Sequence, residues 1–206
     1  MNLKCAVAVI AASLLPAYAI ASPQNDLRDI RIGMPVSELP RSGYGGFACE
    51  ADPQHQLSGW EAYQTCPAST DGTYVVSFRY DDGGPGGEDK TEVAGHPVEL
   101  ALLIDNNGQV AGIKIDTDPH ARLYMHKKAF LFALQVRARF GEEGWTCHQT
   151  APAPTEQPVG GVFIHEHCEK TTESRRYLLD CELFRDPSKD LRDFTNSTQL
   201  TILRAG

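Results

Sequence analysis

The chain has 206 residues, of which 41% are hydrophobic and 22% are charged, enough for one sizeable core or two small ones. These shares exclude a disordered chain. A formal net charge of −8 argues against general nucleic-acid binding, because phosphate recognition needs a basic surface. The 18 glycines and 13 prolines follow no period, which excludes a collagen-like or low-complexity chain.

The N-terminal residues have the layout of a secretory signal peptide. Lys4 precedes the apolar run 5–15, and small residues follow with Ala-x-Ala sites that fit cleavage after Ala19 or Ala21. We therefore expect residues 1–21 to be removed and residues 22–206 to form a single domain in the periplasm or outside the cell. No later segment reaches the roughly 18 apolar residues of a membrane helix, so we expect a protein that does not span the membrane.

Export places the cysteines in an oxidising compartment, where disulfides form. Without Cys5, an odd number remains, and the simplest account is two disulfides and one free thiol. Cys49 and Cys66 flank a turn-rich loop and are predicted to pair. The second pair comes from Cys147, Cys168 and Cys181, which leaves three options. We favour Cys147 with Cys168, because they flank a proline-rich connection that could bring two strands side by side.

The middle of the chain predicts strands and a hairpin. Residues 74–80 are β-branched and aromatic with partial alternation, as in a strand, and a glycine-rich loop follows. Residues 98–104 and 110–115 are apolar runs on either side of Asp105-Asn106-Asn107-Gly108. Asn-Gly between two such runs predicts a β-hairpin whose central turn residues both have positive φ.

A long helix is expected next, from about Pro119 to Phe140. Asp116, Thr117 or Asp118 could cap its start, and Gly141 should end it. Its centre, residues 129–134, is apolar around the whole circumference rather than along one stripe. We therefore expect this helix to be buried on more than one side, between strands of the two halves of the chain or under a partner.

The last third predicts an antiparallel meander, with strands around residues 145–148, 162–168, 176–184 and 200–203. Hairpin, long helix and meander together indicate an α+β fold, with antiparallel sheets built from hairpins packed around one central helix at 119–140. The single domain could consist of two sub-halves that this helix joins.

The densest group of metal-ligand side chains lies near one predicted strand. His165 and His167 share a face of that strand, and His148 from the preceding strand could add a third ligand for Zn²⁺ or Cu²⁺. The alternative is that Cys168 lies in a disulfide and that the histidines occupy the solvated face of the sheet, which needs polar residues in any case.

An acidic, glycine-rich segment at residues 81–92 is a second candidate metal site. Its carboxylates, from Asp81, Asp82, Glu88, Asp89 and Glu92, suit a hard cation such as Ca²⁺. Gly83 and Pro85, however, stand where the known twelve-residue calcium loop places side-chain oxygens. A solvated loop is the alternative.

The predicted helix collects positive charge in an otherwise acidic chain. No acidic residue occurs between Asp118 and Glu142, whereas five basic residues do: Arg122, Lys127, Lys128, Arg137 and Arg139. They could bind an anionic ligand or partner, or extend over the apolar helix to carboxylates of the sheet.

The sequence contains no motif of a known catalytic site, neither a nucleophile elbow, a zinc-protease helix, a phosphate-binding loop nor Cys-x-x-Cys. We therefore expect an exported protein that binds an envelope protein or a small ligand without chemistry of its own. A periplasmic metal-binding protein is the first alternative. A hydrolase whose residues meet only in space is the second, and no cofactor is indicated.

Overall fold

The computed structural model describes residues 25–81, 91–121 and 129–206, and the expected signal peptide lies outside these ranges. The described elements are β1 (Tyr44–Cys49), β2 (Asp52–Gln56), β3 (Tyr74–Tyr80), β4 (Glu92–Val93), β5 (His96–Ile104), β6 (Val110–Thr117), α2 (Ala129–Phe140), β7 (Thr146–Gln149), β8 (Ile164–Thr171), β9 (Arg175–Arg185) and β10 (Phe194–Arg204), with two 3₁₀ helices, η1 (Val36–Glu38) and η2 (Trp60–Thr65).

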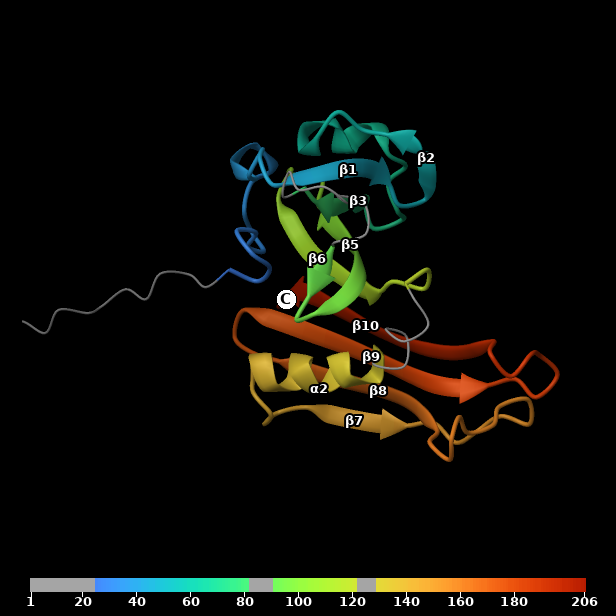
Figure 1. Ribbon diagram of the computed structural model, residues 1–206. Helices are drawn as coiled ribbons and strands as arrows, with labels where there is room; N and C mark the ends of the chain where they lie inside the picture. Colours follow the sequence, from blue (N-terminus) through green and yellow to red (C-terminus); the bar gives the residue numbers. More distant parts are fainter. Residues whose placement is uncertain (1–24, 82–90, 122–128) are drawn as a thin grey trace, which may run out of the picture.

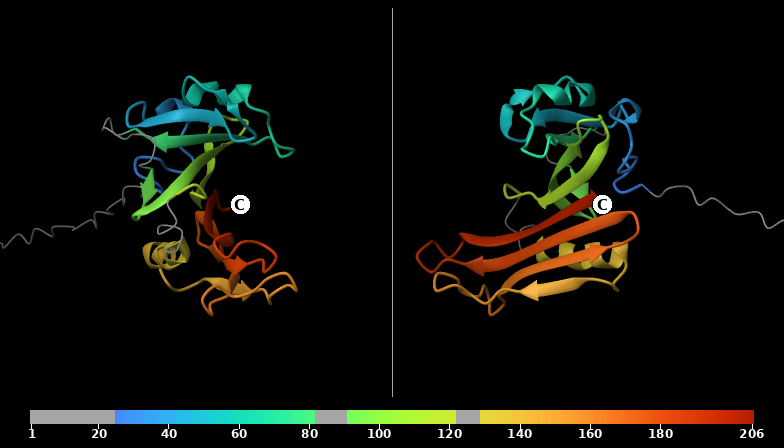
Figure 2. Two further views of the ribbon diagram at one scale, coloured as in Figure 1. Left: turned by 45° about the vertical axis from the view of Figure 1, so that its right-hand side comes forward. Right: turned by 180° about the vertical axis from the view of Figure 1, so that it is seen from behind.

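The strands form one antiparallel sheet with the order β2-β1-β3-β5-β6-β10-β9-β8-β7, and the short β4 pairs with β5. The N-terminal half contains β1 to β6, and the C-terminal half contains β7 to β10. Hydrogen bonds between β6 and β10 join the two halves. In Figure 1 the halves form an upper and a lower lobe, and the turned views of Figure 2 show the same two lobes meeting at the middle of the sheet.

One face of this sheet is apolar across both halves. A single row of cross-strand neighbours runs from Phe78 in β3 to the edge strand β7. The row consists of Phe78, Leu100, Ile115, Leu200, Leu179, Cys168 and Cys147. Because strand side chains alternate between faces, the neighbouring row belongs to the opposite face. That row is polar and consists of Glu99, Asp116, Gln199, Asp180, His167 and His148.

Irregular segments cover the apolar face in the N-terminal half. Trp60 of η2 is 4% exposed, and its ring meets Phe47 and Phe78 edge to face, with centroids 4.5 and 4.9 Å away. Its indole N–H donates to the carbonyl of Pro40 at 2.9 Å, so the one polar atom of this buried ring is satisfied. Leu27, Ile30, Ile32 and Leu39 of the preceding segment belong to the same core.

A single helix covers the apolar face in the C-terminal half. Phe132, Ala133 and Val136 of α2 are buried against it, and the helix packs mainly on β9 and β10. Figure 1 shows α2 running along the strands of the lower lobe. The Thr198 hydroxyl of β10 donates to the Ala129 carbonyl at 2.9 Å and fixes the start of the described helix. The helix ends at Phe140, and Gly141 follows with φ of 86°, as the sequence predicts.

The expected long central helix at 119–140 is wrong. Pro119 and His120 form a turn, in which the Asp118 carboxylate accepts the His120 N–H at 2.7 Å, and the helix of the described residues has only 12 residues. An Asp-Pro sequence such as Asp118-Pro119 favours such a turn as readily as a helix start, and here the turn follows β6 directly. The fold is therefore a predominantly antiparallel sheet with a short helix on one face, and not an α+β arrangement around a central helix.

The expectation that this helix is buried on several sides is also wrong for its described part. Leu131 is 37% exposed and Leu134 is 58% exposed, on the side away from the sheet. A helix that is apolar all round can be buried on every side, but its sequence does not require this, since folded proteins expose many apolar side chains. Contact with the sheet therefore buries the face of α2 that carries Phe132, Ala133 and Val136, and the opposite face stays exposed.

The predicted hairpin and meander are confirmed. β5 and β6 pair around residues 105–109, and β7 to β10 pair with their sequence neighbours. The hairpin turn differs from the expectation, because Gly108 has φ of 70° while Asn107 has no positive φ. The Asp105 carboxylate accepts the N–H groups of Asn107 and Gln109 at 2.9 and 3.0 Å, which stabilises a turn with one left-handed residue rather than two.

Both favoured disulfides are present in the structure. Cys49 pairs with Cys66 and Cys147 pairs with Cys168, and Cys181 remains a buried free thiol. Cys147 and Cys168 are directly opposite each other on β7 and β8, so the strand pairing itself brings the two sulfurs together. Among the described residues, no helix has the length and apolar character needed to cross a membrane.

Candidate functional site

A cleft lies where the two covers of the apolar face meet. Its cavity of about 340 Å³ has an apolar floor formed by Ile115 of β6 and Leu200 of β10. One wall is the face of α2 that carries Phe132 and Val136. The other wall comes from the N-terminal half and consists of Asp26, Leu27, Arg28, Tyr80, Glu92, Val93 and Ala94. This volume lies in the range of small-molecule sites, about 300–1,000 Å³.

A second, more polar cavity of about 540 Å³ continues from the first and shares Asp26, Arg139 and Phe140 with it. Asn25, Arg31, Ser174, Arg175 and Tyr177 complete its lining, together with Ile32. We call the two cavities together the seam cleft. It offers an apolar floor at one end and a polar mouth at the other, which is the pattern of sites for ligands with an apolar body and a polar head.

An internal ion pair organises the mouth of the seam cleft. Arg175 donates to both carboxylate oxygens of Asp26, at 2.8 and 3.0 Å, and the same carboxylate accepts the Ile32 N–H at 2.8 Å. Asp26 is only 7% exposed, so its charge needs these donors. The carboxylate in turn raises the pKa of Arg175, which stays charged. This pair ties the N-terminal segment to β9.

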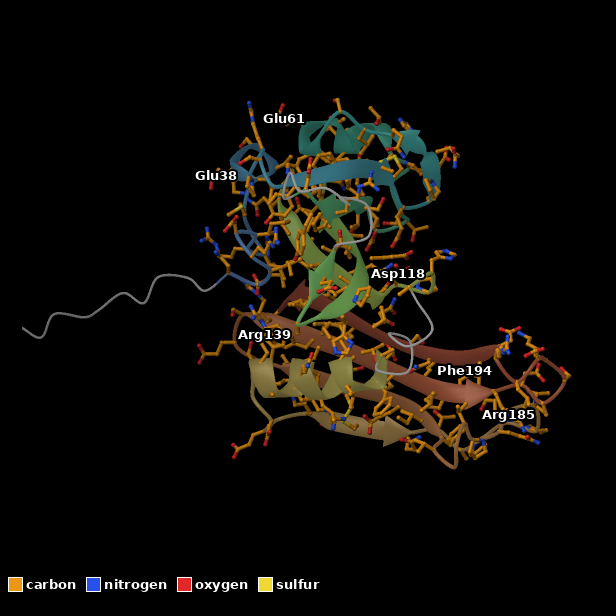
Figure 3. The ribbon with its side chains drawn as sticks, viewed as in Figure 1. Glu38, Glu61, Asp118, Arg139, Arg185 and Phe194 are labelled. Atoms are coloured by element: carbon orange, nitrogen blue, oxygen red, sulfur yellow. A yellow bond between two sulfur atoms is a disulfide. The ribbon has the colours of Figure 1, made fainter. Side chains whose placement is uncertain are left out.

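The remaining charge in the seam cleft is mostly positive. Once Asp26 and Arg175 neutralise each other, Arg31 and Arg139 stand against the carboxylate of Glu92. The Arg28 guanidinium lies over the Tyr80 ring, 3.5 Å from its centroid. Among the described residues, Arg31 and Arg139 have no carboxylate at ion-pair distance. Figure 3 shows Arg139 at the end of α2 below the N-terminal segment.

The structure separates the basic residues that the sequence groups on one helix. Arg137 points to the sheet, where its Nη2 lies 2.6 Å from a carboxylate oxygen of Glu166. Arg139 lines the seam cleft. Arg122, Lys127 and Lys128 lie outside the described residues. Of the two interpretations, contact with a sheet carboxylate is observed for Arg137, whereas anion binding by Arg139 stays a prediction.

The three candidate histidines lie on the polar face of the sheet, as expected for residues that alternate with Cys168. His167 Nδ1 is 2.6 Å from Asp180 Oδ1 and its Nε2 is 3.1 Å from Glu169 Oε1. These two carboxylates raise the pKa of His167 and favour the imidazolium, which has no lone pair for a metal. His165 stacks on Phe184 with ring centroids 5.7 Å apart, and its Nε2 is 3.6 Å from Glu182.

Three ligand atoms do not converge at these histidines. Among the described residues, only Cys147, Glu166 and Cys168 place three potential ligand atoms within 4.8 Å of one another. The two sulfurs of that group are joined in a disulfide and are not available as thiolates. A metal site formed by His148, His165 and His167 stays a prediction.

The acidic segment is only partly described. Asp82, Glu88 and Asp89 lie outside the described residues. Asp81 follows β3 and its N–H donates to the Gly43 carbonyl at 3.0 Å, while Glu92 begins β4 and lines the seam cleft. Calcium binding by residues 81–92 likewise stays a prediction.

Sequence reasoning missed the residues of the seam cleft that come from the N-terminal segment. Asp26 and Arg175 are 149 positions apart, and no spacing motif connects them. The apolar spacing of Leu27, Ile30 and Ile32 could have indicated a packed segment, since all three are buried. Nothing local could have indicated that this segment faces the end of α2.

Comparison with known proteins gives no match to a family model, to a curated protein or to a solved structure.

Proposed function

We propose that this is an exported binding protein whose seam cleft holds a small amphipathic anion, a molecule with an apolar body and one carboxylate or phosphate head. The observation that carries the proposal is the junction of an apolar floor, Ile115 and Leu200, with a mouth where arginines outnumber carboxylates. Export is supported by the N-terminal sequence pattern and by two disulfides, which persist in oxidising compartments.

The apolar body would lie between Phe132 and Val136 of α2 and Leu27 of the N-terminal segment. Burying it stabilises the complex by about 25 cal/mol for each Å² of apolar surface removed from water. The head would face Arg31 and Arg139. A guanidinium pairs bidentately with a carboxylate or phosphate, so these arginines select for an anion while the floor selects for an alkyl or aryl body.

Calorimetric titration with decanoate and with decanol, both below the concentration at which they aggregate, tests this proposal. We expect decanoate to bind more tightly than decanol, because the two share the apolar body and differ in the head. Arg139→Gln should weaken decanoate at least several-fold and leave decanol unchanged.

Arg192→Gln is the matched control, because it removes one exposed arginine from the loop between β9 and β10, away from the cleft. If Arg139→Gln and Arg192→Gln weaken decanoate equally, the binding reflects net charge rather than the seam cleft. Absence of binding by both probes would refute the proposal for amphiphiles of this length.

A further inference from the structure

The Cys147–Cys168 disulfide lies in an unusual electrostatic setting. Arg137 of α2 places one nitrogen, Nη2, 2.8 Å from the Cys147 sulfur and 2.7 Å from the Cys168 sulfur. A disulfide is neutral and gains little from a guanidinium, whereas a thiolate gains a charge-assisted hydrogen bond. The position of Arg137 therefore favours the reduced, ionised sulfur over the disulfide.

The two sulfurs of this disulfide differ in their access to solvent. Cys147 is an exposed residue of β7, which forms one edge of the sheet. Cys168 is 0% exposed and lies between β7 and β9. Cys147 is therefore the more accessible of the two cysteines for a thiol from solvent, and Cys168 is enclosed. If a thiolate attacks the Cys147 sulfur, the Cys168 sulfur becomes the leaving group, and it lies next to the Arg137 guanidinium.

Glu166 opposes this effect. Its Oε2 is 2.6 Å from Arg137 Nη2 and 3.3 Å from the Cys168 sulfur, so it shares the guanidinium and repels a thiolate at Cys168. The site thus contains one group that favours the leaving thiolate and one that disfavours it. Replacing each group separately should change the exchange rate in opposite directions.

The third cysteine does not act as the nucleophile. Cys181 lies on the same face of β9, opposite Glu166, and is 3% exposed. Burial raises the pKa of its thiol, so it stays protonated at neutral pH, and its sulfur lies 3.6 Å from the Thr198 hydroxyl oxygen.

We propose that the Cys147–Cys168 disulfide is a thiol–disulfide exchange centre that oxidises dithiols. A substrate thiolate attacks the Cys147 sulfur, the bond between Cys147 and Cys168 breaks, and its electron pair leaves on the Cys168 sulfur beside Arg137. The second substrate thiolate then attacks the substrate sulfur of this mixed disulfide and releases Cys147. The substrate dithiol becomes a disulfide, and two electrons and two protons reach the two cysteines.

The other disulfide of the same chain is the internal control. Cys49 and Cys66 are 0% and 4% exposed, so neither sulfur presents an open side to a thiol. The full chain with Cys181→Ser, which removes the free thiol, is treated with dithiothreitol or with a short peptide that contains two cysteines. Alkylation at intervals followed by mass spectrometry then reports each cysteine separately. We expect Cys147 and Cys168 to be reduced first with both probes.

Reduction of Cys147–Cys168 by the peptide probe alone would restrict the substrate to peptides, and its reduction by dithiothreitol alone would restrict the substrate to small dithiols. Reduction of Cys49–Cys66 at the same rate or faster overturns the proposal. A monothiol, glutathione, traps the mixed disulfide, and we expect it on Cys147. A mixed disulfide on Cys168 would contradict the assigned direction of attack.

Two substitutions separate the electrostatic role from a packing role. Arg137→Gln should slow exchange about threefold to tenfold, Glu166→Gln should accelerate it, and Arg137→Lys should restore part of the rate, because it keeps the charge. If these groups only pack against the disulfide, both Arg137→Gln and Glu166→Gln loosen the site and accelerate exchange. That outcome, or no change in either variant, overturns the proposal, provided that thermal melting shows the variants folded.

Discussion

The two halves of the sheet bury the same apolar face under different covers. In the N-terminal half, η2 and the segment around Leu27 and Leu39 enclose the face with an aromatic cluster centred on Trp60. In the C-terminal half, one short helix covers the face and leaves its own outer side exposed at Leu134. The irregular cover encloses its disulfide completely, whereas the helix leaves Cys147 at an open edge.

This difference shows how one sheet can support two kinds of region. An irregular segment can bend with the twisted sheet, whereas a helix is a straight rod that departs from the sheet at its ends and flanks. The seam cleft is the space that remains where the two covers meet. The proposed ligand cleft thus lies at the junction of the two covers and the proposed exchange disulfide lies beside the helix, while we expect stability to be concentrated on the aromatic side.

The largest expected effect tests that concentration of stability. Trp60→Ala should lower the free energy of unfolding by about 3–5 kcal/mol, because it opens a large cavity among Phe47, Phe78 and Tyr44. Urea denaturation followed by circular dichroism measures this change. Leu191→Ala, at a side chain that is 76% exposed, is the control and should change the value by less than about 0.5 kcal/mol. A loss below about 1 kcal/mol for Trp60→Ala would contradict the aromatic core.

The two disulfides allow a matched comparison of stability. Their sequence separations are 17 and 21, so chain entropy alone predicts that each stabilises the fold by about 3 kcal/mol. Cys49→Ser with Cys66→Ser should cost more than Cys147→Ser with Cys168→Ser, because the first pair also places two hydroxyls in a buried site. The urea midpoints of the two double variants measure this difference. A larger loss of stability in the Cys147→Ser, Cys168→Ser variant would contradict the prediction that the N-terminal half is the more stable one.

The attachment of α2 to the sheet has a smaller expected effect. Thr198→Val keeps the shape of the side chain but removes the hydrogen bond to the Ala129 carbonyl, which should cost about 1–2 kcal/mol. Thr201→Val, on the opposite face of β10, serves as the control. Hydrogen exchange should show faster exchange within α2 for Thr198→Val only. Equal exchange in both variants would mean that packing alone holds the helix.

The smallest expected effect depends on pH and concerns the polar face. Asp180, and then Glu169, raise the pKa of His167 above its usual 6.5, so the folded chain binds this proton more tightly than the unfolded chain. The stabilisation is complete below the unfolded value and is lost as the pH rises through the folded value. It should stay below about 1 kcal/mol, because these groups are exposed.

His167→Gln should therefore flatten the fall in stability above about pH 6.5, the ordinary histidine pKa. His148→Gln, at the neighbouring position of β7, should not. Urea midpoints at several pH values test this pair. An unchanged slope in His167→Gln would show that the carboxylates do not hold the proton.

Local patterns predicted β3, the β5–β6 hairpin, the meander of β7 to β10 and the favoured disulfides, because these depend on alternation and on neighbours in sequence. They missed β1, β2 and the two-residue β4, which lie in stretches rich in turn-forming or acidic residues. They failed at residues 119–121, because an Asp-Pro sequence is compatible with a turn as well as with a helix start, and here the preceding strand leads into a turn. They also failed for the exposed side of α2, because apolar residues do not report what covers them.

The site was less accessible to prediction than the fold. Arg139 was recognised as a candidate anion-binding residue, but its partners in the seam cleft come from residues 25–31 and from β9, far away in sequence. Arg137 was grouped with Arg139 although it faces the disulfide. Side chains two positions apart on a helix point in different directions, and only the packing of the helix shows where each one ends.

The position of β10 has a consequence for the order of folding. Although residues 194–204 are the last strand of the chain, they lie in the interior of the sheet, between β6 and β9. A chain that leaves the ribosome or a translocation pore N-terminus first therefore carries two open strand edges until these residues are free. Such edges invite pairing with other chains, so an exported chain of this topology gains from a factor that shields it until its last strand arrives.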